Sequence, residues 1–191
     1  MGGVNWKYAL LQHPRKPPSE GAKTLVLHAM RGDIGDRAAA LVMASAADAA
    51  IQGAIAYALG LKQPEQFSMF YNEGLFPTFH GRITAAATLN LIGTIASTNA
   101  RIVKDVRNVF AHAMSDVSFA DDPIVKACDR IKLTTTSQFF VDQEGTKKTR
   151  YTFGYAWQEI YSGILGRIGM GLTGTIPPQT RVVLPDLPML P

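Results

Sequence analysis

The stretch that decides the fold runs from Ala38 to Leu61 and reads AAALVMASAADAAIQGAIAYALGL. It is long enough for a helix of about six turns, and an apolar stripe at helical spacing follows it, made of Leu41, Ala44, Ile51, Ile55 and Leu59. The stretch has the length of a membrane span, but its many alanines and its polar Asp48 and Gln52 predict the central buried helix of a soluble bundle. Because Asp48 falls on the apolar stripe, we expect it to meet a partner in the core or across an interface.

Length and composition indicate one ordinary folded domain. The chain has 191 residues, of which 47% are apolar and 18% are charged, and these values exclude a disordered chain. Since a helical protein so poor in charge often covers part of its surface by self-association, we predict a homodimer. The net charge of +4 permits a polyanionic partner but lacks the dense positive surface of a non-specific DNA binder.

The cysteine content and the start of the chain favour a cytoplasmic protein. Cys128 is the single cysteine, so the chain predicts neither an internal disulfide nor a cysteine-based zinc site. The first six residues, Met1 to Trp6, show no signal pattern. The histidines His13, His28 and His80 lack metal-ligand spacing, and we predict no metal and no cofactor.

The proline distribution divides the chain into three parts. A proline-rich run ends an N-terminal arm at residues 1–18, and five prolines predict an extended C-terminal tail at residues 175–191. Between them, residues 19–174 predict an all-α, single-domain bundle of about six to seven helices. The expected helices are 19–32, 36–60, 65–71, 79–92, one from about residue 97, one after Asp122 as its cap, and 153–172.

The segment 134–152 departs from the helical pattern. Its threonines at 134–136 and the run Phe139 to Val141 have strand propensity, and Glu144-Gly145 could form a turn. The pattern predicts either a short β-hairpin or an irregular insertion and does not separate the two. Residues 147–151, KKTRY, could contact RNA or form a solvated turn.

Groups able to do chemistry gather in the hexad 107–112, RNVFAH. At about 100° per residue, one arc of the helix is predicted to be buried; it holds Ile102, Val103, Val106, Val109, Phe110 and Ala113. Arg107 lies on one flank of this arc, and Asn108 and His112 lie on the other, where Asn108 could hydrogen-bond the His112 ring. Arg107 and His112 are about 140° apart on one helix. They could converge only if the helix unwinds near Ala111 or a two-fold axis brings two copies together.

These residue types suit metal-independent cleavage of RNA, which carries its own nucleophile in the 2′-hydroxyl. His112 could transfer the proton, Arg107 could stabilise the phosphorane charge, and Asn108 could orient the ring. A simpler alternative also fits the pattern. Arg107 and Asn108 would then only solvate the helix flank, and His112 would interact with carbonyls at the helix C-terminus.

Four strings of the chain resemble the mannitol operon repressor family. They are FHGRI at 79–83, LNLIG at 89–93, IVKDVRNVFAH at 102–112 and SFADDP at 118–123. The resemblance covers about residues 33–131 and, more faintly, 151–165, and it implies an all-helical regulator of sugar operon expression. The sequence shows no helix-turn-helix, so direct sequence-specific DNA binding is not predicted.

The hexad also resembles the signature of the HEPN superfamily, which includes metal-independent ribonucleases and inactive binding proteins. Arg107, Asn108 and His112 match that signature position by position. The first prediction is a regulator that binds RNA or a protein partner without chemistry. The alternative is an endoribonuclease in which Arg107, Asn108 and His112 are catalytic.

Overall fold

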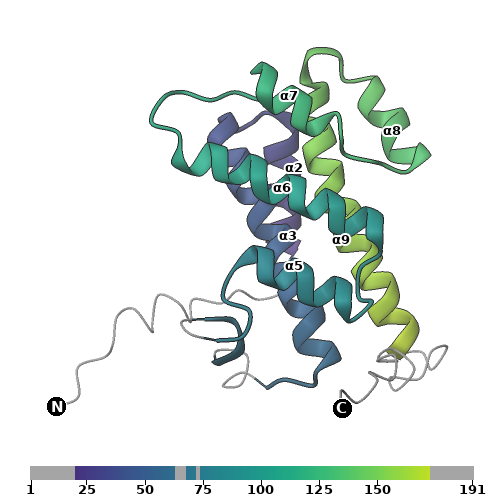
Figure 1. Ribbon diagram of the computed structural model, residues 1–191. Coiled ribbons are helices and arrows are strands. Elements are labelled where there is room, and N and C mark those ends of the chain that lie inside the picture. The colour runs from purple at the N-terminus through teal and green to yellow at the C-terminus, as the bar shows by residue number, and fades with distance from the viewer. Residues whose placement is uncertain (1–19, 63–67, 72–73, 173–191) are drawn as a thin grey trace, which may run out of the picture.

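A computed structural model describes residues 20–62, 68–71 and 74–172, and these residues form a helical bundle without strands (Figure 1). The helices are α2 (Glu20–Arg31), α3 (Asp36–Ala58), α5 (Phe79–Thr88), α6 (Thr94–His112), α7 (Asp122–Cys128), α8 (Thr135–Asp142), the 3-10 helix η1 (Gly145–Lys147) and α9 (Lys148–Leu172). The predicted all-α bundle is confirmed. The predicted N-terminal arm and proline-rich tail lie outside the described residues.

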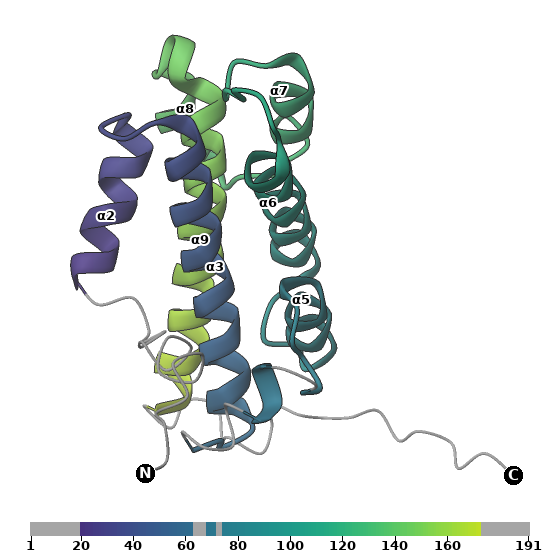
Figure 2. The same ribbon diagram turned by 90° about the vertical axis from the view of Figure 1, so that its left-hand side faces the viewer.

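The helix α3 lies at the centre of the bundle. It packs against α2, α5, α6 and α9, and it runs beside α9 in two perpendicular views (Figures 1 and 2). Its small buried side chains let these neighbours approach closely; they are Ala39, Ala40, Ala44, Ala47, Ala50, Ala54 and Ala56. Within the described residues, α3 is the one helix long and apolar enough to cross a membrane, but 61% of its most apolar window is buried. Such burial is compatible with the core helix of a soluble protein.

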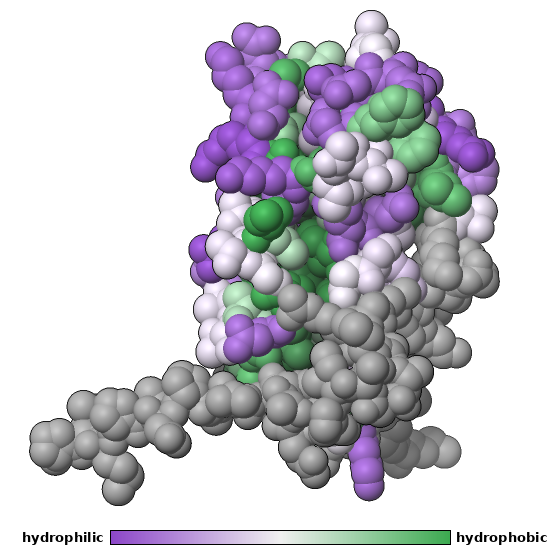
Figure 3. Space-filling model, turned by 90° about the vertical axis from the view of Figure 1, so that its right-hand side faces the viewer, coloured by the Kyte–Doolittle hydropathy of each residue, from purple (hydrophilic) through white to green (hydrophobic). Residues whose placement is uncertain are grey.

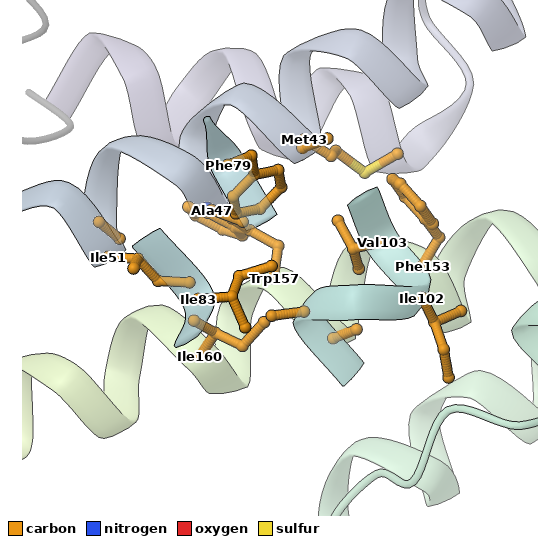
Figure 4. Packing of buried hydrophobic residues seen from close by; sticks show 14 of the residues in the cluster. Met43, Ala47, Ile51, Phe79, Ile83, Ile102, Val103, Phe153, Trp157 and Ile160 are labelled. Carbon is orange, nitrogen blue, oxygen red and sulfur yellow. The ribbon is translucent and has the colours of Figure 1, made fainter. Parts of the chain in front are cut away.

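Large side chains from the surrounding helices fill the core around α3 (Figure 4). Ile83 of α5, Val103 of α6 and Ile160 of α9 are all fully or almost fully buried. A second group of rings joins α6 to α9, because Phe119 lies 4.9 Å from Phe110 and 5.5 Å from Phe153, centroid to centroid. The position of α6 is therefore fixed by contacts along its length.

Several helix ends differ from the predicted ones. The helix α5 ends at Thr88, short of residue 92, because the chain turns at Asn90, whose φ is +54°. The helix α6 begins at Thr94 after Gly93 as its N-cap residue, three residues before the predicted start. In α7 the cap position belongs to Asp121, and Asp122 is the first helical residue. Each difference is a shift of a few residues at a helix end, where the hydrophobic pattern is weakest.

The prediction for segment 134–152 was wrong, because the segment is helical. Thr134 caps α8 by accepting a hydrogen bond from the Ser137 amide at 3.3 Å, and Gly145 makes the turn into η1 with a φ of +52°. Packing on α9 decides this outcome: Val141 is fully buried, and the ring of Phe140 stacks on Tyr155 at 6.3 Å. Tertiary contacts thus override the strand propensity of the segment.

The start of α9 is fixed by a buried arginine, and the string 147–151 forms the end of η1 and the first turn of α9 rather than a loop. Arg150 pairs with Asp36 at 2.6 Å and also donates to the carbonyls of Ala29 and Ile34. The other oxygen of Asp36 accepts from the Ser118 hydroxyl at 2.7 Å. Arg150 therefore joins α9 to both ends of the turn between α2 and α3.

Candidate functional site

The helix α6 buries one face, and Arg107, Asn108 and His112 of the hexad lie outside that face. Ile102, Val103, Val106 and Phe110 are buried as predicted. Val109 was predicted to be buried with them, but it is 47% exposed, because no element of the described bundle covers that edge of the arc. The helix α6 therefore has an apolar position on its outer face.

Arg107 and Asn108 interact directly with each other. The Arg107 Nη1 donates to the Asn108 Oδ1 at 2.9 Å. The predicted hydrogen bond between Asn108 and His112 is not found among the described residues, where the Asn108 amide oxygen instead accepts from Arg107. Asn108 therefore orients the guanidinium of Arg107 and not the His112 ring.

Arg107 and Asn108 line a cleft of about 630 Å³. Lys104, one turn earlier on α6, lies in the same wall, and His80 of α5 also lines the cleft. Aromatic side chains complete the lining with Phe70, Tyr71 and Phe79. The volume is in the range of small-ligand sites.

A buried ion pair closes the cleft on the side of α3. The Arg82 Nε and Nη2 donate to the two oxygens of Asp48 at 2.6 and 2.7 Å, and Arg82 is only 3% exposed. This pair confirms the prediction that Asp48 meets a partner, and the partner is in the core. Because these two charges neutralise each other, and because the Lys104 Nζ pairs with the Asp105 Oδ1 at 2.7 Å, Arg107 is the cation of the cleft lining for which no carboxylate partner is found among the described residues.

The start of α5 adds to the positive potential of the cleft. Thr78 caps α5 by accepting from the Gly81 amide at 3.1 Å, and Thr78, Phe79 and His80 all line the cleft. The first backbone N–H groups of a helix have no acceptor within the helix, and they attract anions. The start of α5 therefore favours an anion over a cation at this end of the cleft.

His112 does not belong to this cleft. It is the last residue of α6 and is exposed, and within the described part of the chain its side chain makes no hydrogen bond, neither to Asn108 nor to the helix carbonyls. The helix is regular through Ala111, so of the two arrangements that could bring Arg107 to His112, unwinding of the helix is not found. Arg37 holds the chain beyond His112 by donating to the carbonyls of Ala113 and Ser115 at 3.0 and 2.9 Å.

Sequence reasoning missed Lys104, His80 and the Asp48–Arg82 pair as parts of the site. The spacing of three residues between Lys104 and Arg107 is a signal that was present, since such residues share a helix face. His80 carries no local signal, because its place depends on the packing of α5 against α6. His28 lies apart from the cleft and pairs with Asp33 at 2.6 Å.

Two other kinds of chemistry find no support in the described residues. No group of three or more histidine, cysteine, aspartate or glutamate side chains is arranged to hold a metal ion there. Burial, with a smaller effect of the Asp129 charge, raises the pKa of the Cys128 thiol to about 12. Cys128 is therefore a protonated core residue at neutral pH, as its burial in α7 implies.

Comparisons of the chain with models of known protein families, with curated proteins and with solved structures find no match. The resemblance to mannitol operon repressors and to the HEPN superfamily therefore stays a prediction. The geometry of the cleft is the main support for a function.

Proposed function

We propose that the protein is a cytoplasmic regulator of gene expression that binds an RNA strand in the cleft beside Arg107. The observation that supports this proposal is that Lys104 and Arg107 line one concave site together with the half-buried Tyr71. Cations attract the phosphate backbone, and aromatic rings accept stacked bases. Phe70 and Phe79, which also line the site, are only 0% and 6% exposed, so Tyr71 is the ring of the lining that a base would stack on.

The bond between Arg107 and Asn108 also supports anion binding. A guanidinium that is already oriented loses less side-chain entropy when it binds phosphate. The mild net charge of +4 suits a protein that attracts RNA at a defined site. Direct reading of an operator is not proposed, because no described helix pair forms a helix-turn-helix.

The test is RNA binding measured by fluorescence anisotropy with a labelled single-stranded RNA in excess EDTA. Since a hydrogen bond to a charged group contributes about 1.5–3 kcal/mol, Arg107→Ala should weaken binding by roughly tenfold or more. The slope of log K against log salt concentration should also become less steep by about 0.7 in the Arg107→Ala variant. This is the value for one lost phosphate contact on a single strand.

Arg101→Ala is the matched control for this test. Arg101 is an exposed arginine of the same helix and does not line the cleft, so its loss should change the affinity by less than about twofold. Equal binding by the Arg107→Ala variant and the wild type would contradict the proposal. Failure of the wild type to bind any RNA tested would do the same.

A second candidate function is metal-independent cleavage of RNA by Arg107 and His112. It is favoured by the exposure of His112 and by the absence of a side-chain hydrogen bond to it within the described residues. In one chain His112 lies outside the cleft lining, so this function needs a second copy to bring a histidine to the cleft.

Cleavage is tested by incubating single-stranded and structured RNA with the protein in excess EDTA. The expected products carry 2′,3′-cyclic phosphate ends and disappear in His112→Ala but persist in His28→Ala, which alters another exposed histidine. Products that persist in His112→Ala, or no cleavage by the wild type, remove the enzyme candidate. Binding without cleavage leaves the regulator as the function.

A further inference from the structure

An apolar groove of about 520 Å³ lies on the other side of α5. Its apolar lining comes from Leu59, Leu75, Phe76, Ala85 and Leu89. Leu75 is 75% exposed and Leu59 is 42% exposed, so the groove is open at the surface. Exposed leucines around a hollow mark a site where a partner covers apolar surface.

The groove adjoins the cationic cleft. His80 lines both hollows, and the consecutive residues Phe76 and Pro77 line one each. The two hollows therefore form one composite surface, with an apolar half along α5 and a cationic half at Lys104 and Arg107. His80 stands at the boundary between the halves.

We propose that this composite surface binds one short segment of a protein partner, in which leucine-like side chains lie next to an acidic side chain. The apolar side chains occupy the groove, and the carboxylate lies in the cleft opposite Arg107. Charge complementarity selects this occupant, since Arg107 attracts an anion at one end, and none of the described residues that line the groove is an acid, a lysine or an arginine. The proposal goes beyond RNA binding and does not depend on it.

The shape of the groove agrees with a peptide segment. Along α5 the groove is lined by His80, Thr84 and Thr88, which span two turns or about 12 Å of helix. This length matches two or three side chains of a partner helix at i, i+3 or i+4, and i+7. A small apolar ligand would leave much of its surface exposed in such an open groove, and an RNA strand would place phosphates on apolar side chains.

If RNA also binds the cleft, the two ligands compete for Arg107. A partner protein that covers the groove would then release RNA, which couples a protein signal to RNA binding. Two sites that share a residue exclude each other by direct overlap, and no conformational change is needed.

The experiment selects peptides from a random 12-residue displayed library on the immobilised full chain. The selected peptides should carry at least two leucine-like residues and one acidic residue within about two helical turns. One selected peptide is then synthesised and labelled, and its affinity is measured by fluorescence anisotropy.

Two variants locate the peptide. Thr84→Arg places a charge in the groove and should weaken peptide binding by roughly tenfold or more, whereas Thr98→Arg on the exposed face of α6 should leave it within about twofold. Both threonines are exposed, so both variants should keep the helical circular dichroism of the wild type. Arg107→Ala should weaken the acidic peptide but not the same peptide with its acid changed to the amide.

Several results would overturn the proposal. They are no enrichment over an empty support, a consensus without acidic residues, and equal affinity for the wild type and Thr84→Arg. A bound peptide that leaves bound RNA undisturbed would also exclude the shared surface. If the wild type binds the acidic peptide but no RNA, RNA binding fails as the function and the peptide site stands.

Discussion

Arg82 joins α5 to α3 and to the segment that precedes α5. Besides its two bonds to Asp48, Arg82 donates through Nη1 to the carbonyls of Phe76 and Pro77 at 3.0 and 3.1 Å, and more weakly to that of Phe70 at 3.4 Å. The wall of the cleft is therefore attached to α3 through one buried guanidinium. A charge so buried is tolerated only because every side of it meets an acceptor.

We predict that Asp48→Ala strongly destabilises the protein. The change leaves the Arg82 charge buried without its carboxylate, and loss of one partner of a buried pair costs about 3–5 kcal/mol. The free energy of unfolding, measured by urea denaturation, checks this. Asp105→Ala is the control, because Asp105 pairs with Lys104 at the surface and is 67% exposed, and such pairs contribute about 1 kcal/mol or less. Similar losses in the two variants would contradict the role of Arg82.

The thiol of Cys128 should be unreactive in the folded protein. Its pKa is raised from 9.0 to about 12 by burial, so the neutral form is favoured by folding. The stability that the folded state gains by keeping this thiol neutral is fully present up to pH 9. It is lost as the pH rises from 9 toward 12. Alkylation by iodoacetamide at pH 8.5, followed by mass spectrometry, should be at least about tenfold slower than in the guanidinium-unfolded chain. Equal rates would show an accessible thiolate.

At the scale of helices, the sequence predicts best where burial and local pattern agree. The helix α3 was predicted nearly to its ends, because its apolar residues keep a helical period over six turns. Segment 134–152 was mispredicted, because its threonines and phenylalanines have strand propensity while its helical state depends on packing against α9. That packing involves Val141 and the Phe140–Tyr155 stack, which join residues that no local pattern relates.

Two glycines of α9 differ in their surroundings. A Cβ at Gly154 would lie 2.4 Å from the Met30 Cγ, whereas a Cβ at Gly163 would meet nothing within 4 Å. Gly154 thus lets α2 approach α9, and Gly163 faces open space. The remaining glycines of the helix lie where no side-chain environment is described.

We predict opposite effects for the two glycine-to-alanine changes in α9. Gly154→Ala should destabilise by about 1–3 kcal/mol, because Met30 is buried and must move. Gly163→Ala should stabilise by up to about 1 kcal/mol, because alanine is the better helix former. Thermal unfolding followed by circular dichroism measures both. Stabilisation by Gly154→Ala would show that α2 and α9 are less tightly packed than the contact with Met30 implies.

At the scale of the whole molecule, the sequence predicted part of the site and placed its residues imperfectly. Arg107 and Asn108 could be identified from the sequence of a single helix, because they are neighbours in the chain. The cleft depends on α3, α5 and α6 meeting, and this meeting is a property of the tertiary fold that a single sequence does not reveal. The same limit applies to His112, whose partner across a two-fold axis would belong to another copy.

The low charge content of the chain has a visible counterpart at the surface. Figure 3 shows hydrophobic patches among hydrophilic residues on one face of the molecule. Among the described residues, several large apolar side chains are exposed, and three of them, Ile95, Val109 and Met114, lie on α6 or just beyond its end. From these positions we predict that the outer face of α6 forms the interface of a homodimer, where the exposed apolar side chains would be covered.

We predict that the protein is a homodimer and that Val109→Glu makes it a monomer. A two-fold interface on the outer face of α6 would place Val109 near its copy, and a buried glutamate there would carry an unpaired charge. Light scattering at micromolar concentration should give twice the chain mass of 20.7 kDa for the wild type and the single mass for the variant. Leu25→Glu is the matched control, because Leu25 of α2 has the same exposure of 47% as Val109. A monomeric wild type, or a dimer that survives Val109→Glu but not Leu25→Glu, would exclude α6 as the interface. It would also remove the route by which a second copy could bring His112 to the Arg107 cleft.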